Sequence, residues 1–390
     1  MLIVQKYGGT SLQTPKHIQS AAKRIQTLKQ EGHGVVVVVS AMGHMTDHLI
    51  RIAKKTVAHP PGREMDMLLT AGERVSMSLL AMSLAENGVQ AISFTGSQSG
   101  IITDNQHLSA KILEIRPNRI QEELQKGKVV IVAGFQGVSR EKEITTLGRG
   151  GSDTTAVALA AVLKADRCEI LTDVDGIFTA DPRIVSSAKL LKRCTYDIAF
   201  EMACLGAKMH PRSIDLAKAH GVKIWIGSSR HLGGQDKRGT EIFSNDKDDT
   251  MEKAKVTGVP TKDGYHYFRV TIKLRELIGA LSENGLTLKF FQFSEKDVTF
   301  LMEKEYADKV RKIIQPLSNK IEEKSDLSLV SLVGEGLDSS VEILSGFVDT
   351  MVQTDVECLF LSTGNLSISA AVAAKDKKQV AEKLHAKFLE

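Results

Sequence analysis

Five consecutive valines, Val35 to Val39, restrict the fold of this chain more than any other segment. A β-branched run without a polar interruption predicts a strand covered on both faces, as in a parallel sheet between helical layers. Three more segments repeat this signal, at Val129–Val132, Glu169–Leu171 and Val222–Ile226. The sequence therefore predicts a buried, mainly parallel sheet.

Helical patterns alternate with these strands. Leu2 to Lys6 predicts a first strand, and Thr14-Pro15 then predicts an N-cap with proline at the first helical position. Asp153–Ala165 and Ser213–Ala219 are helical by composition. We expect an α/β domain over residues 1–245, built as a three-layer αβα sandwich around a mainly parallel sheet.

The pattern changes after Phe243. Asn245–Asp249 is a short polar run that predicts a linker, and two smaller units follow within residues 250–390. Each unit reads strand, helix, strand, strand, helix. The first covers Phe268–Ile272, Leu277–Glu283, Leu286–Phe293, Val298–Met302 and Tyr306–Leu317. The second covers Leu327–Val333, Val341–Met351, Val356–Leu361, Leu366–Val372 and Lys378–Phe388. This weak repeat predicts two ferredoxin-like α+β modules.

Composition excludes several functional classes. The 390 residues include 51 basic and 47 acidic side chains, a balance that does not suit a nucleic-acid partner or a polybasic membrane anchor. No run approaches the roughly 18 apolar residues of a membrane span. The four cysteines form no CxxC pair, so we expect four buried thiols in a reducing cytoplasm, and no structural zinc.

The first candidate site is Lys6-Tyr7-Gly8-Gly9-Thr10-Ser11, at the end of the first strand. Glycines let main-chain N–H groups approach a phosphate, and a lysine supplies a point charge for a transferring phosphoryl group. The segment is not a Walker loop, and a simple tight turn is the alternative explanation.

The second candidate is Gly148-Arg149-Gly150-Gly151-Ser152-Asp153, which opens a predicted helix. The helix N-terminus and glycines suit an anion, and Arg149 could bind a carboxylate through two hydrogen bonds. The alternative is that Ser152 or Asp153 only caps the helix.

The third candidate, Thr172 to Arg183, follows a buried strand. The end of a central strand is where an open α/β sheet binds ligands, although an Asp-Gly turn also explains the loop. Asp173-x-Asp175-Gly176 lacks the spacing of a calcium loop. Weaker candidates are Glu73, which a solvated helix face would explain, and Ser40, which a turn would explain.

The motifs together identify a family. KYGGTS, SAMG with Thr46 beyond it, AGERVS, GRGGSDTTAVAL, TDVDGIFTADPR and KMHPRSIDLA closely resemble the aspartate kinases of the amino-acid kinase superfamily. The resemblance extends from Val4 to Phe388. It implies ATP as a substrate, with Mg²⁺ bound mainly through the ATP phosphates and no dedicated protein metal site.

The resemblance also implies which residues bind each substrate. The nucleotide site would comprise Lys6, Tyr7, Gly8, Gly9, Thr172, Asp173, Phe178, Asp181, Pro182, Arg183 and Lys208. The aspartate site would comprise Ser40, Thr46, Glu73, Arg149, Gly150, Gly151 and Ser152. Phe178 stands where many members have tyrosine, so a hydroxyl near the nucleotide is lost.

The chemistry of the reaction agrees with these residues. The side-chain carboxylate of L-aspartate has a pKa near about 3.9 and needs no general base. We therefore expect Lys6, Asp153 and Lys208 to act on the transferring phosphoryl group, with Asp153 orienting Lys6. Arg149 would hold a substrate carboxylate and Glu73 the α-ammonium group.

The two C-terminal modules resemble the tandem ACT domains with which such kinases dimerise and respond to lysine or threonine. Thr271–Glu276 replaces the Asp-x-Pro-Gly loop of effector-binding members and brings in Lys273 and Arg275. We expect a homodimer or higher homo-oligomer and a weak response to lysine alone.

Two alternatives remain at this point. One is a kinase for glutamate, acetylglutamate or a nucleoside monophosphate, against which Arg149, Glu73 and the ACT-like region argue. The other is a catalytically silent amino-acid sensor. The intact residues that argue against it are Lys6, Arg149, Asp153 and Lys208.

Overall fold

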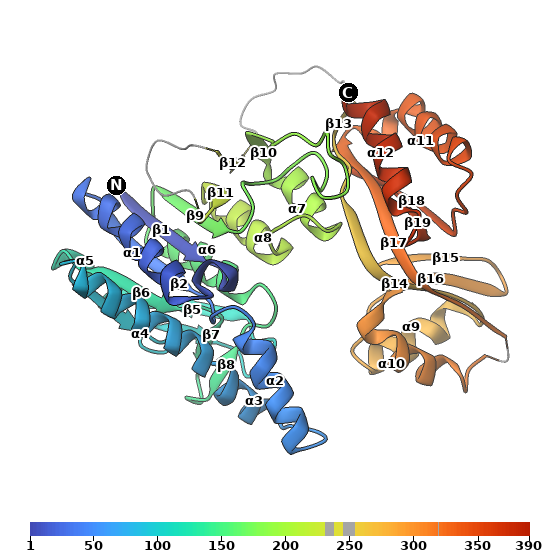
Figure 1. Cartoon of the computed structure of the whole chain (residues 1–390). Coiled ribbons are helices and arrows are strands. Elements are labelled where there is room, and N and C mark those ends of the chain that lie inside the picture. The colour runs from blue at the N-terminus through green and yellow to red at the C-terminus, as the bar shows by residue number, and fades with distance from the viewer. Residues whose placement is uncertain (231–237, 245–253, 319) are drawn as a thin grey trace. The chain divides into compact units, whose positions relative to one another are not determined.

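The computed structural model describes residues 1–230, 238–244, 254–318 and 320–390 (Figure 1). Two compact units make up the chain. The first comprises Met1–Ile177, Leu190–Ala203 and Lys208–Lys247, and the second comprises Phe178–Lys189, Cys204–Ala207 and Asp248–Glu390, apart from the residues outside those ranges. The linker predicted at residues 245–249 lies outside the described residues.

The first unit contains strands and helices that alternate along most of the chain. Its strands are β1 (Leu2–Tyr7), β2 (Gly34–Val39), β3 (Ala91–Phe94), β4 (Ile101–Thr103), β5 (Ile112–Ile115), β6 (Val129–Ala133), β7 (Gln136–Ser139), β8 (Ile144–Thr146), β9 (Arg167–Thr172), β10 (Arg193–Thr195), β11 (Ile224–Ser228) and β12 (Thr240–Phe243). Its helices are η1 (Gly9–Leu12), α1 (Pro15–Gln30), α2 (Met45–Thr56), α3 (Gly62–Leu69), α4 (Ala71–Glu86), α5 (Asn118–Gln125), α6 (Gly151–Val162), α7 (Tyr196–Cys204) and α8 (Pro211–His220).

The main sheet has the strand order β10-β12-β11-β9-β1-β2-β6-β3. The six strands from β11 to β3 pair in parallel, and β12 is antiparallel to β11. The valine strand β2 lies between β1 and β6, where both of its edges are hydrogen-bonded. The predicted mainly parallel sheet is confirmed.

Helices cover this sheet on two faces. Val35, Val37 and Val39 share a buried cluster with apolar residues of α1 and α4. The alternate residues Val36 and Val38 point to the other face, since strand side chains alternate, and α6 packs there on β1, β2 and β9. This arrangement is the predicted three-layer sandwich.

A separate four-stranded sheet, β5-β4-β7-β8, was not predicted from the sequence. Its strands have only three or four residues each, too few for an alternating pattern to stand out. Thr103 and Thr145 are buried in it and join β4 to β8 through their hydroxyl groups, 2.6 Å apart.

The second unit is α+β. Its strands are β13 (Lys255–Gly258), β14 (Thr261–Thr271), β15 (Phe290–Phe293), β16 (Asp297–Glu303), β17 (Ile321–Glu335), β18 (Phe360–Thr363) and β19 (Ser367–Ala373). Its helices are α9 (Leu274–Glu283), α10 (Lys304–Ile314), η2 (Leu337–Ser339), α11 (Val341–Gln353) and α12 (Lys377–Leu389). The strand, helix, strand, strand, helix pattern is present twice, as the sequence predicts.

The two modules share one antiparallel sheet. Its order is β15-β16-β14-β17-β19-β18, with β13 paired to β17. The long strands β14 and β17 pair with each other, from Thr261 beside Val330 to Val270 beside Ile321. Each module keeps its own apolar core, one around Phe268 and Phe300 and the other around Phe347 and Leu384.

Cysteine burial differs from the sequence expectation. Cys168 and Cys194 are buried, but Cys204 is half-buried and Cys358 is exposed, so the prediction of four buried thiols is wrong for two of them. Cys358 lies in the loop that precedes β18, and its Sγ donates a hydrogen bond to the Phe360 carbonyl oxygen at 3.4 Å. A loop position exposes a residue type that is usually buried.

Candidate active site

Several loops of the first unit begin at one edge of the main sheet. In the parallel register Tyr7 lies beside Val39 and Leu171, and Val39 lies beside Ala133. The first residues after these strands are Gly8, Ser40, Gly134 and Asp173. The carboxyl edge of an open parallel sheet is its usual ligand-binding edge, so the first and third sequence motifs meet at the expected place.

Lys6 forms an ion pair at this edge. It is the penultimate residue of β1, and its Nζ lies 2.6 Å from Oδ1 of Asp153 in the first turn of α6. Both side chains are only 12% exposed. Because α6 packs directly on β1, the helix presents Asp153 to the lysine. Partial burial keeps the pair in a region of low dielectric, where a charge acts strongly on a neighbouring anion.

Tyr7 points to the opposite face of the strand. Its side chain is fully buried in the core beneath α1 and α4, and its hydroxyl donates to Oε1 of Gln5 at 3.1 Å. Burial raises the pKa of Tyr7 above its ordinary value. Only the main chain of Tyr7 is left to meet a nucleotide, so its predicted role does not extend to its ring.

The glycines after β1 pack against main chain. A Cβ atom at Gly9 would lie 2.8 Å from the carbonyl oxygen of Ala41, and the N–H of Gly43 donates to the carbonyl oxygen of Gly9 at 2.9 Å. The N–H of Gly8 donates to the carbonyl oxygen of Leu171 at 3.2 Å. Gly8 thus joins the loop to β9, and its N–H is already engaged within the protein.

The second motif contains two left-handed glycines. Gly148 has φ 74° and Gly150 has φ 70°, values that glycine adopts without strain. A Cβ atom at Gly150 would lie 2.1 Å from a ring carbon of His210. Gly150 is the N-cap of α6 and no side chain caps the helix, so the alternative that Ser152 or Asp153 serves as a cap is wrong.

Arg212 supports this loop from α8. Its guanidinium donates to the carbonyl oxygens of Leu147 at 2.9 Å and of Ala110 at 3.1 Å. Arg212 lies within the quoted KMHPRS motif, but sequence reasoning gave it no role. Its function becomes visible only when α8 and the loop are placed side by side.

Asp66 is a second support that the sequence did not reveal. It is fully buried on α3, and its carboxylate accepts from Thr146 Oγ1 at 2.5 Å and from the Leu108 N–H at 3.1 Å. Nδ1 of His107 lies 2.6 Å away. In the sequence, a buried aspartate such as Asp66 cannot be distinguished from an exposed one, because both appear as a single acidic residue in a helical pattern.

Glu73 is buried at the same edge of the sheet. It lies in the first turn of α4 and is 3% exposed, so the solvated-face explanation is wrong. Its Oε1 accepts from the Ala41 N–H at 3.1 Å, while its buried Oε2 has no hydrogen-bond partner among the described residues. Burial raises the pKa of Glu73 to about 7. The carboxyl group therefore lacks one donor.

Lys208 and Asp173 form another pair, 3.1 Å apart. The hydroxyl of Thr172 also donates to Oδ1 of Asp173 at 3.0 Å. Burial opposes the charge on Asp173, but the hydrogen bonds from Lys208 and Thr172 prevail and hold its pKa below the usual value. Lys208 itself is about half-exposed and can reach a ligand in solvent.

Comparison with known proteins decides the family. The amino acid kinase family matches residues 1–228, and the ACT domain family matches residues 330–388. Aspartokinase 2 of Bacillus subtilis strain 168 is 41% identical to this chain over an alignment of 406 positions. The alignment covers 99% of this chain and 97% of that protein. The chain belongs to the aspartokinase family. The resemblance seen in the sequence motifs is confirmed.

Solved structures agree with this aspartokinase fold. E. coli aspartokinase III in complex with aspartate and ADP (R-state) matches with a TM-score of 0.85 at 24% identity. The same enzyme in complex with lysine and aspartate (T-state) matches with a TM-score of 0.79 at 23% identity. Each match covers 100% of both chains. The α/β sheet followed by an antiparallel α+β region is thus the fold of this family.

Part of the predicted nucleotide site of this aspartokinase belongs to the second unit. Phe178, Asp181, Pro182 and Arg183 lie in the segment Phe178–Lys189. There the Arg183 guanidinium binds the Asp181 carboxylate at 2.6 and 3.0 Å, and this contact lowers the pKa of Asp181. No pattern in the sequence indicates that this loop packs in a different unit from Lys6.

The other predicted aspartate-site residues lie in the first unit. Ser40 follows β2 and is half-buried, Thr46 lies in the first turn of α2, and Arg149 is exposed between the two left-handed glycines. Gly151 and Ser152 begin α6, and both are buried. Ser152 also packs closely on Gly134, where a Cβ atom would lie 2.8 Å from its Oγ.

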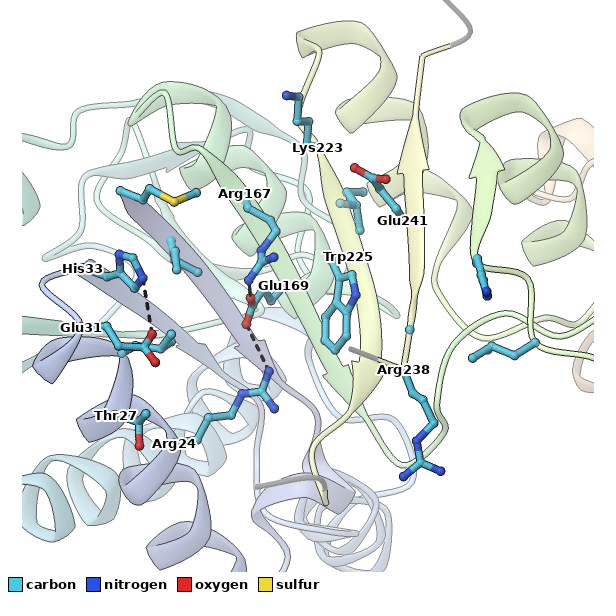
Figure 2. Close-up of a pocket in the computed structure, with 17 residues that line it drawn as sticks. Arg24, Thr27, Glu31, His33, Arg167, Glu169, Lys223, Trp225, Arg238 and Glu241 are labelled. Atoms are coloured by element: carbon cyan, nitrogen blue, oxygen red, sulfur yellow. Dashed lines mark hydrogen bonds and ion pairs between the residues drawn. The ribbon is translucent and has the colours of Figure 1, made fainter. Parts of the chain in front are cut away.

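A cavity of about 880 Å³ is present elsewhere in the first unit (Figure 2). Its lining includes Glu169 and Trp225, near the amino-terminal ends of β9 and β11, and Arg24 from α1. Gly8 and Thr172 lie at the carboxyl ends of the strands, so this cavity is distinct from the edge that holds the sequence motifs.

No described helix combines the length and apolar character needed to cross a membrane. Within the same residues, no group of three or more histidine, cysteine, aspartate or glutamate side chains is placed to hold a metal ion.

Proposed function

We propose that this aspartokinase transfers the γ-phosphoryl group of ATP to the side-chain carboxylate of L-aspartate. The product is 4-phospho-L-aspartate, which would enter the synthesis of lysine, threonine and methionine. The observation that carries the proposal is the buried ion pair of Lys6 and Asp153 at the carboxyl edge of the sheet. A carboxylate acceptor is already ionised at neutral pH, so the enzyme needs cations and positioning rather than a base.

Lys6 and Lys208 would neutralise the charge that develops on the transferring phosphoryl group. Each ammonium group is held by one aspartate, Asp153 at 2.6 Å and Asp173 at 3.1 Å. A cation fixed in advance need not reorganise when the phosphoryl group moves, and this lowers the barrier. Asp153 and Asp173 are thus positioning residues.

Glu73 would bind the α-ammonium group of aspartate. Its buried Oε2 lacks a donor among the described residues, and an ammonium group supplies one together with the opposite charge. Arg149 would bind a substrate carboxylate, since a guanidinium matches a carboxylate with two hydrogen bonds. Ser40, Thr46, Gly150, Gly151 and Ser152 would complete this half of the site.

The nucleotide would be bound by Lys6, Gly8, Gly9, Thr172, Asp173 and Lys208 of the first unit. The family resemblance adds Phe178, Asp181, Pro182 and Arg183, which belong to the second unit. Mg²⁺ would be held mainly by the ATP phosphates and would neutralise part of their charge. The cations Lys6 and Lys208 fit the charge of a triphosphate. We assign catalysis to residues 1–245, and regulation and homodimer formation to residues 250–390.

Trapping the product with hydroxylamine tests the reaction. Full-length protein, ATP and Mg²⁺ are incubated with L-aspartate, L-glutamate, N-acetylglutamate or a nucleoside monophosphate, and the hydroxamate and ADP are both measured. We expect hydroxamate and ADP in equal amounts with aspartate alone. Product with another acceptor would identify a different kinase, and no product with any acceptor would identify a silent sensor.

A further inference from the structure

The cavity of about 880 Å³ is built from the first unit alone (Figure 2). The strands β1, β9, β11 and β12 and the last turns of α1 all contribute lining residues. Its volume is sufficient for a small organic molecule, since ligand sites span roughly 300–1,000 Å³. No residue of the proposed kinase site lines it.

Trp225 gives this cavity an aromatic wall. It is the one tryptophan of the chain. A Cβ atom at Gly227 would lie 2.1 Å from indole Cη2, and one at Gly239 would lie 2.4 Å from Cε2. The indole therefore lies over two residues that have no side chain, close against the strand main chain. Trp225 remains half-buried and lines the cavity, and the Arg24 guanidinium lies over its ring, 5.9 Å from the centroid. A flat ligand in the cavity would therefore meet both the indole and a cation.

Glu169, the buried acidic residue of the cavity lining, has hydrogen-bond and ion-pair partners for both of its carboxylate oxygens. Glu169 is 2% exposed, and its Oε2 accepts from Gln5 Nε2 at 2.7 Å and lies 3.5 Å from Arg24. Arg167 binds its Oε1, as the dashed lines in Figure 2 mark. Charge at Glu169 is thus compensated locally and does not repel an anion that enters the cavity.

Basic side chains outnumber acidic side chains in the lining of the cavity. The lining contains five arginine and lysine side chains against three glutamates. Of the other two glutamates, Glu241 lies 3.4 Å from Arg193 and Glu31 lies 3.5 Å from His33. The ammonium groups of Lys192 and Lys223 are exposed and have no carboxylate partner among the described residues. The cavity therefore favours a negative ligand.

We propose that this cavity binds a small planar anion, an aromatic or heterocyclic ring that carries a carboxylate or a phosphate. The ring stacks on Trp225, and Lys192 and Lys223 attract the anionic group. The proposal is independent of the kinase reaction, because the cavity shares no residue with the proposed substrate sites. Both lysines are exposed, so their charge can be removed without disturbing the core.

Tryptophan fluorescence reports on this site directly, because Trp225 is the one tryptophan of the chain and the whole tryptophan emission comes from it. The full-length protein is titrated with AMP and with nicotinate, and adenosine and nicotinamide serve as neutral analogues. We expect a saturable change with at least one anion, at an affinity about tenfold or more above that of its neutral analogue. A response to AMP alone identifies phosphate as the anionic group, and a response to nicotinate alone identifies carboxylate.

Paired substitutions assign the signal to the cavity. Lys192→Gln with Lys223→Gln is expected to weaken the anion about tenfold, whereas Lys54→Gln with Lys55→Gln on α2 removes equal charge outside the cavity and should leave the affinity unchanged. The proposal is overturned if the neutral analogues bind equally, if neither anion gives a saturable change, or if both double variants behave alike. Kinase activity of the Lys192 and Lys223 double variant should remain, so failure of the kinase proposal is seen separately.

Discussion

Lys6 and Asp153 illustrate how one pair can serve both stability and chemistry. Both side chains are 12% exposed, so each charge depends on the other for compensation. Removing one partner of a largely buried pair leaves an unpaired charge, which costs about 3–5 kcal/mol when burial is complete and less here. A lysine variant could therefore lose activity through stability or through chemistry, and the two effects need separate tests.

Lys6→Met is expected to lower turnover by about 10³-fold or more, because a charge aimed at the phosphoryl group is removed. It should also lower the melting temperature, since Asp153 is left unpaired. Adding Asp153→Asn should restore much of the melting temperature and none of the turnover. Steady-state kinetics and thermal unfolding of both variants check this, and near-normal turnover in folded Lys6→Met would refute the role of Lys6.

Glu73 links the pH dependence of stability to that of substrate binding. Burial raises its pKa to about 7, above the ordinary value near 4.5. Between these values the unfolded chain has lost the proton and the folded protein still holds it. Stability from this group therefore falls as pH rises from about 4.5 to about 7, by roughly 3 kcal/mol at most.

Glu73→Gln should remove that fall in stability, because glutamine does not ionise. In the native protein the KM for aspartate should decrease as pH rises toward about 7, since the carboxylate is the form that binds an ammonium group. In Glu73→Gln the KM should be high and nearly independent of pH over this range. Kinetics and thermal unfolding between pH 5 and pH 8 measure both effects. An unchanged pH profile of KM in the variant would place the ammonium site elsewhere.

At the scale of elements, α12 holds the segment Phe178–Lys189 within the second unit. His385 of α12 is fully buried, and its Nε2 lies 2.9 Å from Thr179 Oγ1 while its Nδ1 lies 3.1 Å from Glu390 Oε1. The main chain of Thr179 also bonds to Val259, and Ala180 forms a bridge to Val259. The segment that carries Phe178 to Arg183 is thus fixed by the C-terminal helix.

His385→Leu is expected to destabilise the protein by about 1–3 kcal/mol, because the partners of the imidazole lose their hydrogen bonds in a buried site. If the segment contributes to nucleotide binding, the KM for ATP should rise more than kcat falls. Lys383→Ala, an exposed change on the same helix, is the control and should alter neither. A lower melting temperature with an unchanged KM for ATP would limit His385 to a structural role.

The start of α9 determines what the first ACT-like module can bind. Lys273 is the N-cap of α9 and Arg275 lies in its first turn, so two cations adjoin the positive end of the helix dipole. The nearby carboxylate of Asp297 is occupied by the Thr271 hydroxyl at 2.7 Å and by Arg269 at 3.1 Å. The side-chain ammonium group of a lysine effector would be repelled by these two cations.

We therefore expect weak or absent inhibition by lysine alone, with threonine or a combination of both as the stronger signal. A ligand shifts an enzyme only by its differential affinity for two states, so a weakened site gives weakened control. Kinase activity is measured with millimolar lysine, threonine and both together. Strong inhibition by lysine alone would show that the effector binds away from α9.

At the scale of the whole molecule, the two units are interleaved along the sequence. Ala180 and Val185 of the segment Phe178–Lys189 are buried in the same cluster as Val330 and Phe347. A cut near residue 245 therefore removes the core into which this segment packs. The second unit resumes at Asp248, within the linker that composition predicts at Asn245–Asp249, but composition did not predict that Phe178–Lys189 and Cys204–Ala207 also belong to the second unit.

A fragment of residues 1–245 is expected to sediment as a monomer, because the proposed dimerisation region is removed, and to melt below the full chain. The exposed apolar side chains of Ala180 and Val185 should also make it prone to aggregate. Val185→Ser in the fragment should reduce aggregation, whereas the same change in the full chain should lower stability. Sedimentation and thermal unfolding check both, and a dimeric fragment would place the interface in residues 1–245.

Local sequence was sufficient for the central strands of the main sheet and for the motif positions, but not for the short strands of the sheet β5-β4-β7-β8. Val35–Val39 predicted the central strand, and the pattern after Phe243 predicted two modules with the correct order of elements. These predictions succeed because periodicity and glycine content reflect local backbone preferences. They place Lys6 at the end of a strand and Gly150 at the start of a helix without knowledge of what packs nearby.

Tertiary packing decided the rest. Lys6 meets Asp153 only because α6 lies on β1, Glu73 is buried only because α4 meets the end of β2, and Tyr7 faces the core rather than a ligand. Burial and pairing depend on which distant segments come together, and no local pattern carries that information. The sequence alone determined the longer elements, the motifs and the family, while the three-dimensional structure decided which side chains are buried, paired and accessible.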